Sequence, residues 1–256
     1  MLLHLDKEKI ARCFRRSLPT YDEAARVQKE LAVRLLQCLE ALPDATFRRV
    51  LEIGCCTGVL TEMLCCDKPV ETLFLNDLVP EFEKVTLNKL PRRQSLHVTP
   101  LFGDIETLAL PPDINLVISG ATFQWLADLP AFFSRLGREL TSGSYLAFSL
   151  FGPGTLQEFS QLTSVGLGYR SDKEVCLLLE EDFVMEEQVS FQDKLFFPSV
   201  REILYHIRAT GVGGVSEYRW SRETLASFEK RYRQEFGDKK GLPVSYSCSC
   251  FLARRR

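Results

Sequence analysis

The order of apolar and polar residues predicts strands that alternate with helices over the first 150 residues of the chain. Apolar side chains recur every three or four positions over residues 22–42, which predicts an amphipathic helix whose start Asp22 can cap. Continuous apolar runs follow, of the kind typical of strands that are covered on both faces. These expected strands are 49–53, 71–76, 95–103, 114–120 and 142–151, and the expected helices between them are 58–66, 79–90 and 127–140.

The alternation is interrupted after residue 151 and then resumes. Two short helical patterns and a long amphipathic strand come first, at 153–163, 172–182 and 183–197. Two further helices and a closing strand, which we expect to be antiparallel and at or near an edge of the sheet, follow at 199–211, 222–237 and 242–253.

This pattern predicts an α/β fold with a doubly wound, mostly parallel sheet, an N-terminal helix and a small insertion. We expect residues 1–256 to form a single domain. We also expect residues 152–195 to be a cap insertion over the carboxyl ends of the strands, because ligands of such sheets bind there.

Composition and charge narrow the possible partners. The 256 residues are 45% hydrophobic, which is enough for one large core, and the net charge of −2 is no signature of nucleic-acid binding. Residues 201–256 nevertheless carry twelve Lys and Arg against six Asp and Glu, whereas residues 172–193 carry eight acids and one lysine. Both segments can be solvated faces. The basic segment can instead be a surface that meets an acidic partner.

Cysteine usage and hydropathy indicate a cytoplasmic protein. The nine cysteines include no pair with metal-binding C-x-x-C spacing, so we expect reduced thiols and no metal site. We also expect no signal peptide, because residues 1–20 are charged and lack an apolar core. No apolar run approaches the ~18–20 residues that span a bilayer, so no membrane association is expected.

The segment "VLEIGCCTGVL" at residues 50–60 predicts a buried strand, a tight turn and the start of a helix. Glu52, Gly54 and Gly58 fit a turn that cradles a nucleotide, because glycine allows a close backbone approach and a helix N-terminus favours anionic groups. Cys56 stands where a third glycine is expected.

Acidic residues follow the next two expected strands. Asp77, 25 residues after Glu52, can accept both hydroxyls of a ribose. Asp104 can accept a hydrogen bond from an adenine amino group, and Ile105 can pack against the adenine ring. Together with the loop in "VISGATFQWL" at 117–126, these residues predict a cofactor that contains adenosine.

Four motifs resemble those of the class I S-adenosylmethionine-dependent methyltransferases, which have a seven-stranded Rossmann-like sheet: "VLEIGCCTG", "LNDL", "GDIE" and "VISGATFQW". Further segments resemble the malonyl-acyl-carrier-protein O-methyltransferases of biotin synthesis. They are "FRRSLPTYDEAARVQ", "FQWLADL", "FGPGTLQEF", "FPSVREILYHIRATGV" and "GLPVSYSCSCFLARR". The resemblance runs from about residue 9 to the C-terminus.

The resemblance implies methyl transfer from S-adenosylmethionine to the free carboxylate of a malonyl thioester in the pathway to the pimeloyl chain of biotin. That carboxylate is ionised at neutral pH, so no general base and no catalytic side chain are needed beyond proximity and orientation. The three histidines fit no catalytic triad. The implied partner is a malonyl-loaded acyl carrier protein or malonyl-CoA. Acyl carrier proteins are acidic, so Arg15, Arg16 and the basic segment 201–256 are expected to form a positive rim.

The resemblance also assigns site residues by position. Gly54 would lie against the methionine part, and Tyr21 and Gln28 would close over the cofactor. The complete expected cofactor set is Tyr21, Gln28, Glu52, Gly54, Cys55, Gly58, Asp77, Leu78, Asp104, Ile105 and Ser119. The acceptor carboxylate needs a cation or several donors. Candidates for contact with the acceptor are Tyr21, Trp125, Arg170, Arg201 and Arg208.

Two departures from the family pattern leave alternatives open. Cys56 replaces a glycine, and Asn115 replaces the acid that usually opens the fourth motif. If the backbone at Cys56 needs a positive φ, its Cβ costs roughly 1 kcal/mol or more. The alternatives are a methyltransferase of a free small carboxylic acid and a degenerate methyltransferase-fold scaffold or assembly protein.

Overall fold

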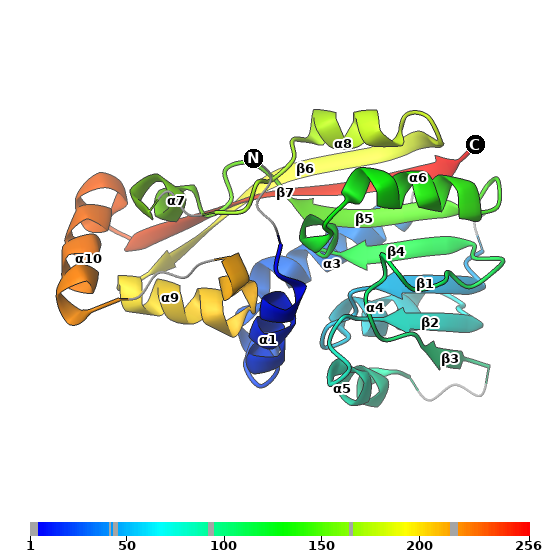
Figure 1. The fold of residues 1–256 in the computed structure, drawn as a ribbon, viewed down its shortest axis with the longest axis horizontal. Helices are drawn as coiled ribbons and strands as arrows, with labels where there is room; N and C mark the ends of the chain where they lie inside the picture. The colour runs from blue at the N-terminus through cyan, green and yellow to red at the C-terminus, as the bar shows by residue number, and fades with distance from the viewer. Residues whose placement is uncertain (1–4, 41, 43–45, 92–94, 164–165, 216–219) are drawn as a thin grey trace.

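A seven-stranded sheet forms the centre of the protein, in the order β3-β2-β1-β4-β5-β7-β6 (Figure 1). The computed structural model describes residues 5–40, 42, 46–91, 95–163, 166–215 and 220–256. Strands β1 to β5 pair in parallel, and β7 runs antiparallel to both of its neighbours, so β6 has the same direction as β1 to β5. The strands are β1 Arg49–Ile53, β2 Thr72–Asn76, β3 His97–Pro100, β4 Leu116–Gly120, β5 Tyr145–Phe151, β6 Phe183–Phe197 and β7 Leu242–Arg255. The doubly wound, mostly parallel α/β fold expected from the sequence is confirmed.

Helices cover both faces of this sheet. The α-helices are α1 Lys7–Ser17, α2 Tyr21–Ala24, α3 Arg26–Glu40, α4 Val59–Asp67, α5 Phe82–Lys89, α6 Leu129–Glu139, α7 Gln157–Thr163, α8 Asp172–Leu179, α9 Val200–Ala209 and α10 Arg222–Phe236. Two 3-10 turns are η1 Phe123–Trp125 and η2 Val212–Val215. Within the described ranges, no helix combines the length and the apolar character needed to cross a membrane.

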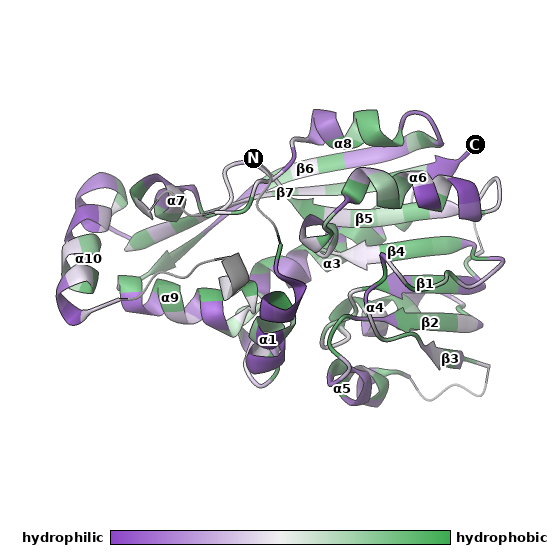
Figure 2. Cartoon of the chain, in the orientation of Figure 1, coloured by the Kyte–Doolittle hydropathy of each residue, from purple (hydrophilic) through white to green (hydrophobic). Residues whose placement is uncertain are grey.

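The central strands are apolar on both sides because each face packs on its own layer of helices. In β1, Val50 belongs to the core cluster that includes α3 and α4, whereas its neighbour Leu51 belongs to the cluster that includes α6 and α8. Both side chains are fully buried. Figure 2 shows the resulting apolar band along β1, β4 and β5. Such strands read as continuous apolar runs, so their positions were predictable.

The helix expected over 22–42 is instead two helices, α2 and α3, which are separated at Ala25 by a non-helical backbone with φ −79° and ψ 48°. Asp22 therefore caps no helix start, and this expectation was wrong. Its carboxylate accepts from the Thr57 hydroxyl at 2.6 Å and pairs with Lys89 at 2.6 Å. These contacts tie α2 to the first turn after β1. An additional helix, α1, precedes it and begins at the cap Asp6.

The last part of the expected insertion belongs to the sheet. Residues 183–195 lie in β6, which pairs with β7 from Phe183 opposite Arg255 to Phe197 opposite Leu242. The long strand β6, rather than β7, forms the edge of the sheet. Helix α8 packs beside α6, and α7 lies next to β7 and α10 (Figure 1). Only the remaining part of 152–195 is therefore available to cover a site at the strand ends.

Candidate cofactor site

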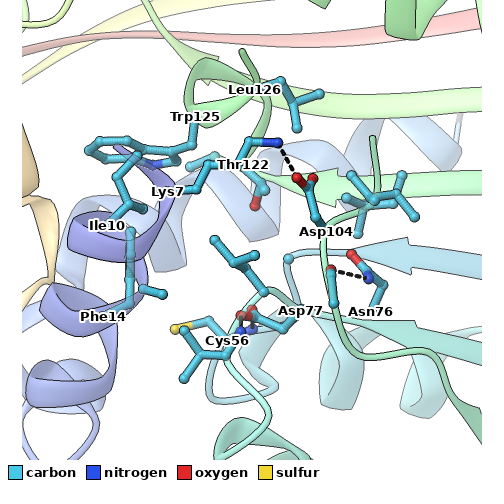
Figure 3. Close-up of a pocket in the computed structure, with 18 of the residues that line it drawn as sticks. Lys7, Ile10, Phe14, Cys56, Asn76, Asp77, Asp104, Thr122, Trp125 and Leu126 are labelled. Carbon is cyan, nitrogen blue, oxygen red and sulfur yellow. Dashed lines mark hydrogen bonds and ion pairs between the residues drawn. The ribbon is translucent and has the colours of Figure 1, made fainter. Parts of the chain in front are cut away.

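A cavity opens at the carboxyl ends of β1, β2 and β4, and α1 lies across it (Figure 3). Lys7, Ile10 and Phe14 of α1 form one wall, and the loops after the strands form the others. Its strand-side lining comprises Ile53, Gly54, Cys56, Asn76, Asp77, Leu78, Val79, Gly103, Asp104, Ile105, Gly120, Ala121, Thr122, Trp125 and Leu126, and Tyr21 of α2 also contributes. The cavity thus lies where the topology of a doubly wound sheet places its ligands.

Gly54 allows two loops to meet at the floor of the cavity. The backbone N–H groups of Gly54 and Cys55 both donate to the Asn76 carbonyl, at 2.9 and 3.0 Å. Gly54 has φ +74°, and a Cβ built there would lie 2.1 Å from Oγ1 of Thr122. Only glycine therefore fits between β1 and the loop that follows β4.

Cys56 adopts the left-handed conformation, with φ +48°. Its N–H donates to Oδ2 of Asp77 at 2.9 Å, and its carbonyl accepts from the Thr86 hydroxyl at 2.9 Å. The thiol lies beside the Tyr21 hydroxyl, and burial raises the pKa of both groups well above their ordinary values. The glycine-like backbone of the motif is thus retained despite the Cβ, and neither group is ionised at neutral pH.

Asp77 is buried and already accepts two backbone hydrogen bonds. Besides Cys56, the N–H of Val79 donates to Oδ1 at 2.8 Å. Burial raises the pKa of the carboxyl to about 6, although these backbone donors oppose the shift. Each carboxylate oxygen retains acceptor capacity, and the group lines the cavity, so it can receive the two hydroxyls of a ribose.

Asp104 lies on the loop after β3 and faces α1 (Figure 3). Lys7 pairs with its Oδ2 at 2.5 Å and also with Glu106. The side-chain amide of Asn76 holds the loop by donating to the carbonyls of Leu101 at 2.6 Å and Gly103. The ion pair therefore fastens the N-terminal helix over the end of the cavity where an adenine amino group would bind.

Glu52 lies beneath the glycine loop and is almost fully buried. Neither carboxylate oxygen has a hydrogen-bond partner among the described residues, although the Thr61 hydroxyl lies beside the carboxyl group. Burial raises the pKa of this carboxyl to about 8, so it is a neutral acid at pH 7. Glu52 is not among the residues that line the cavity.

Several other residues of the expected cofactor set build the frame of the cavity. Gly58 has φ +82° and begins α4, and the Cys55 amide helps to fix the loop. The Ser119 hydroxyl donates to the Ile53 carbonyl at 2.9 Å inside the sheet. Gln28 lies on α3, and its Oε1 is buried without a described hydrogen-bond partner.

The five residues expected to contact the acceptor lie at different places in the structure. Tyr21 and Trp125 line the cofactor cavity, and Trp125 meets Phe14 of α1 edge to face at 5.6 Å. Arg208 lines a second cavity and Arg170 a third. Arg201 is exposed on α9 and belongs to the walls of none of these three cavities.

The residues that sequence reasoning missed come mainly from α1 and the loop after β4. Lys7, Ile10 and Phe14 approach the cavity from a helix that contributes little to the core, so its apolar pattern is sparse. Thr122 packs against Gly54, and this contact depends on the pairing of β1 with β4. The motif "VISGATFQW" was the one available signal for Thr122.

The cavity fits S-adenosylmethionine in three respects. Gly54 lines the cavity where a methionine chain would lie, a carboxyl group with free acceptor capacity faces the centre, and Asp104 with the buried Ile105 lines the end where adenine would bind. Gln28, which was also expected to contact the cofactor, is not among the residues that line the cavity.

Comparisons with known proteins agree with this geometry. A family model described as "Methyltransferase domain" matches residues 51–148. The malonyl-[acyl-carrier protein] O-methyltransferase of Chlorobium phaeovibrioides is 37% identical over 98% of this chain and 97% of its own length. The protein of the same name from Haemophilus ducreyi is 34% identical over 95% of each chain.

Two solved structures share the fold at 15% sequence identity. The N-methyltransferase NodS from Bradyrhizobium japonicum, in complex with S-adenosyl-L-homocysteine, has a TM-score of 0.54 and covers 92% of this chain and 98% of its own. A putative methyltransferase from Bacillus halodurans has a TM-score of 0.62, with coverage of 86% and 97%.

Proposed function

Because this chain belongs to the malonyl-[acyl-carrier protein] O-methyltransferase family, we propose that it transfers the methyl group of S-adenosylmethionine to the free carboxylate of a malonyl thioester. The acceptor is malonyl-loaded acyl carrier protein, and the product enters the biotin (pimeloyl) pathway. The observation that carries this proposal is the near full-length match to these relatives, together with an intact glycine loop held on Asp77.

The chain's own residues bind and orient the cofactor and the acceptor, and they exclude water from the site. The bound cofactor supplies a methyl group that is already activated on a sulfonium. Asp77 and Asp104 are placed to hold the two ends of the adenosine, and Phe14 and Trp125 close one side of the cavity with apolar rings. A malonyl carboxylate is ionised at neutral pH, so alignment of the reacting atoms is the main requirement.

A general base is not needed, and the described histidines are not placed to act as one. His206 is buried on α9, 2.7 Å from the Tyr246 hydroxyl, and burial lowers its pKa to about 4. His97 begins β3 and does not line the cofactor cavity. His4 lies outside the described residues. The expectation of catalysis by proximity and orientation is therefore retained in the proposal.

Both departures from the family pattern are compatible with activity. Cys56 keeps the left-handed backbone and both hydrogen bonds of the loop. Asn115 precedes β4 and accepts from the Arg49 N–H at 3.0 Å, at the end of the sheet opposite the cavity. Neither observation favours a degenerate scaffold. A free small carboxylic acid remains the alternative acceptor that the experiment below tests.

A cytoplasmic location and a carrier partner complete the proposal. The proposed location rests on the cysteines, none of which takes part in a disulfide in the structure. The basic excess of residues 201–256 supports an acidic partner such as an acyl carrier protein.

The decisive experiment incubates the protein with labelled S-adenosylmethionine and one of three acceptors: malonyl-acyl carrier protein, malonyl-CoA or free malonate. Transfer to the thioesters alone is the expected result. Transfer to free malonate alone would establish the small-acid alternative, and cofactor binding without transfer to any acceptor would favour a scaffold.

A further inference from the structure

A second cavity, of about 350 Å³, lies on the other side of α1 from the cofactor cavity. Its walls come from α1, α9 and the segment that follows β5, and they are mainly apolar. Leu204 and Ile207 of α9 form one side. Phe159 and Trp220 form another, with ring centroids 6.3 Å apart, and both rest on Phe228 of α10. The site described above uses none of these side chains.

Two arginines from different helices stand at this cavity. Arg16 of α1 and Arg208 of α9 both line it and are both exposed, so they lie at its mouth. Neither makes an ion pair with any residue in the described ranges, whereas the adjacent Arg15 pairs with Glu81 at 2.5 Å. Two unpaired guanidinium groups beside an apolar cavity suit a ligand with an anionic end and an uncharged body.

The second cavity lies near the cofactor cavity, because a third cavity shares lining residues with each of them. Leu126 lines both the cofactor cavity and a third cavity, and Leu167 and Tyr169 line both the third and the second. The face of α1 that carries Phe14 borders the cofactor, and the face that carries Arg16 borders the second cavity. The arginines and the site of methyl transfer are therefore served by neighbouring cavities on two faces of the same helix.

We propose that the second cavity holds the pantetheine arm of the acyl carrier substrate and that Arg16 and Arg208 bind the phosphate at the outer end of that arm. This assignment rests on the proposed function, because it takes a malonyl thioester as the substrate. The arm is an uncharged chain between a phosphate and a thioester, which matches a mainly apolar cavity with cations at its mouth. The basic segment 201–256, which supplies α9 and α10 beside the mouth, suits an acidic carrier outside it.

The test compares substrates that have and lack the phosphate. Arg16→Gln and Arg208→Gln are assayed with malonyl-acyl carrier protein, malonyl-CoA and the truncated thioester malonyl-N-acetylcysteamine. We expect KM to rise about tenfold for both phosphate-bearing substrates and to stay unchanged for the truncated one, with kcat unchanged. Thermal unfolding checks that each variant is folded.

Two arginines serve as matched controls. Arg12 is exposed on α1, and Arg201 is exposed on α9, and neither lines the second cavity. Arg12→Gln and Arg201→Gln should leave the KM for malonyl-CoA unchanged. An equal rise in the KM for malonyl-CoA in all four variants would show that the effect comes from the overall positive charge of this surface. That result would overturn the cavity assignment. A rise for malonyl-acyl carrier protein alone would do the same, because it would place the arginines at a protein surface rather than on the phosphate.

A binding measurement separates this proposal from the proposed function. Cys13 is a half-buried free thiol that lines the second cavity, so CoA should slow its alkylation by iodoacetamide, as followed by peptide mass spectrometry. Arg16→Gln should weaken this protection. Transfer to malonyl-CoA without protection of Cys13 would refute the cavity assignment alone. Protection without transfer to any thioester would refute the proposed function while showing that the cavity binds the arm.

Discussion

The backbone N–H of Cys56 donates to Oδ2 of Asp77 at 2.9 Å, so the turn after β1 and the acid after β2 form one hydrogen-bonded unit. The bond depends on the left-handed backbone of Cys56, at φ +48°. A residue that would normally be glycine is thus held in a strained conformation by its contact with the acid. The strain and the contact can be tested separately.

We expect Cys56→Gly to be more stable than Cys56→Ala by about 1 kcal/mol in the free energy of unfolding. Both variants lose the thiol and its contact with Tyr21, but only alanine retains a Cβ at a positive φ. Chemical denaturation of the two variants measures the difference. Cofactor affinity and activity should be retained in Cys56→Gly. Equal stabilities would show that a Cβ at this φ carries no strain, and a loss of activity in the glycine variant would show that the thiol has a role of its own.

The affinity for S-adenosylhomocysteine should fall as the pH is lowered through the pKa of Asp77. Burial raises that pKa to about 6 in the free protein, and the carboxylate accepts ribose hydroxyls best when it is ionised. The dissociation constant should therefore rise about tenfold from pH 7 to pH 5. Isothermal titration calorimetry at a series of pH values measures it.

The control for this pH dependence is Asp77→Asn, which keeps the size of the side chain but cannot ionise in this range. The variant should bind more weakly at pH 7, by ~1–3 kcal/mol, with an affinity that is nearly flat between pH 5 and pH 7. A wild-type affinity that does not change with pH would contradict the assignment of Asp77 to the ribose.

The central strands and the two acids were predictable because they depend on local patterns. Buried parallel strands such as β1 are mainly apolar. Asp77 directly follows β2 and Asp104 lies on the loop after β3, and the carboxyl ends of these strands share an edge. The same topology brings the glycine loop to this edge. Sequence order therefore sufficed to place these groups around one cavity.

The errors arose where distant contacts decide the structure. The break at Ala25 interrupts a regular apolar pattern and contains neither glycine nor proline, and Asp22 is held by residues 35 and 67 positions away. The ion pair between Lys7 and Asp104 spans 97 positions. The amphipathic character of β6 was visible, but its pairing with β7 was not.

Gly54→Ala should be far more destabilising than the same change at another glycine with positive φ. At Gly54 the new Cβ would lie 2.1 Å from Oγ1 of Thr122 and 2.7 Å from its Cβ, so steric overlap adds to the backbone strain. We expect a loss of ~3 kcal/mol or more in the free energy of unfolding, together with loss of cofactor binding.

Gly143 is the matched control for this substitution. It has φ +85°, but nothing lies within 4 Å of a Cβ built there, so Gly143→Ala should cost only about 1 kcal/mol. Urea denaturation of both variants gives the comparison. Similar losses at the two sites would mean that the loop after β4 yields easily and that Thr122 does not hold Gly54 in place.

Glu52→Gln should stabilise the cofactor-free protein at high pH. Burial raises the pKa of Glu52 from 4.5 to about 8, so its contribution to stability is complete below pH 4.5 and is lost as the pH rises through 8. The glutamine variant has no such loss, and its Tm should exceed that of the wild type by roughly 5 °C at pH 9 and by much less at pH 5. Glu62→Gln, at an exposed position of α4, should show no comparable change between these pH values. A Glu52→Gln protein whose Tm follows the wild type at every pH would mean that Glu52 is ionised in the folded protein, and its carboxylate would then need a partner beneath the glycine loop.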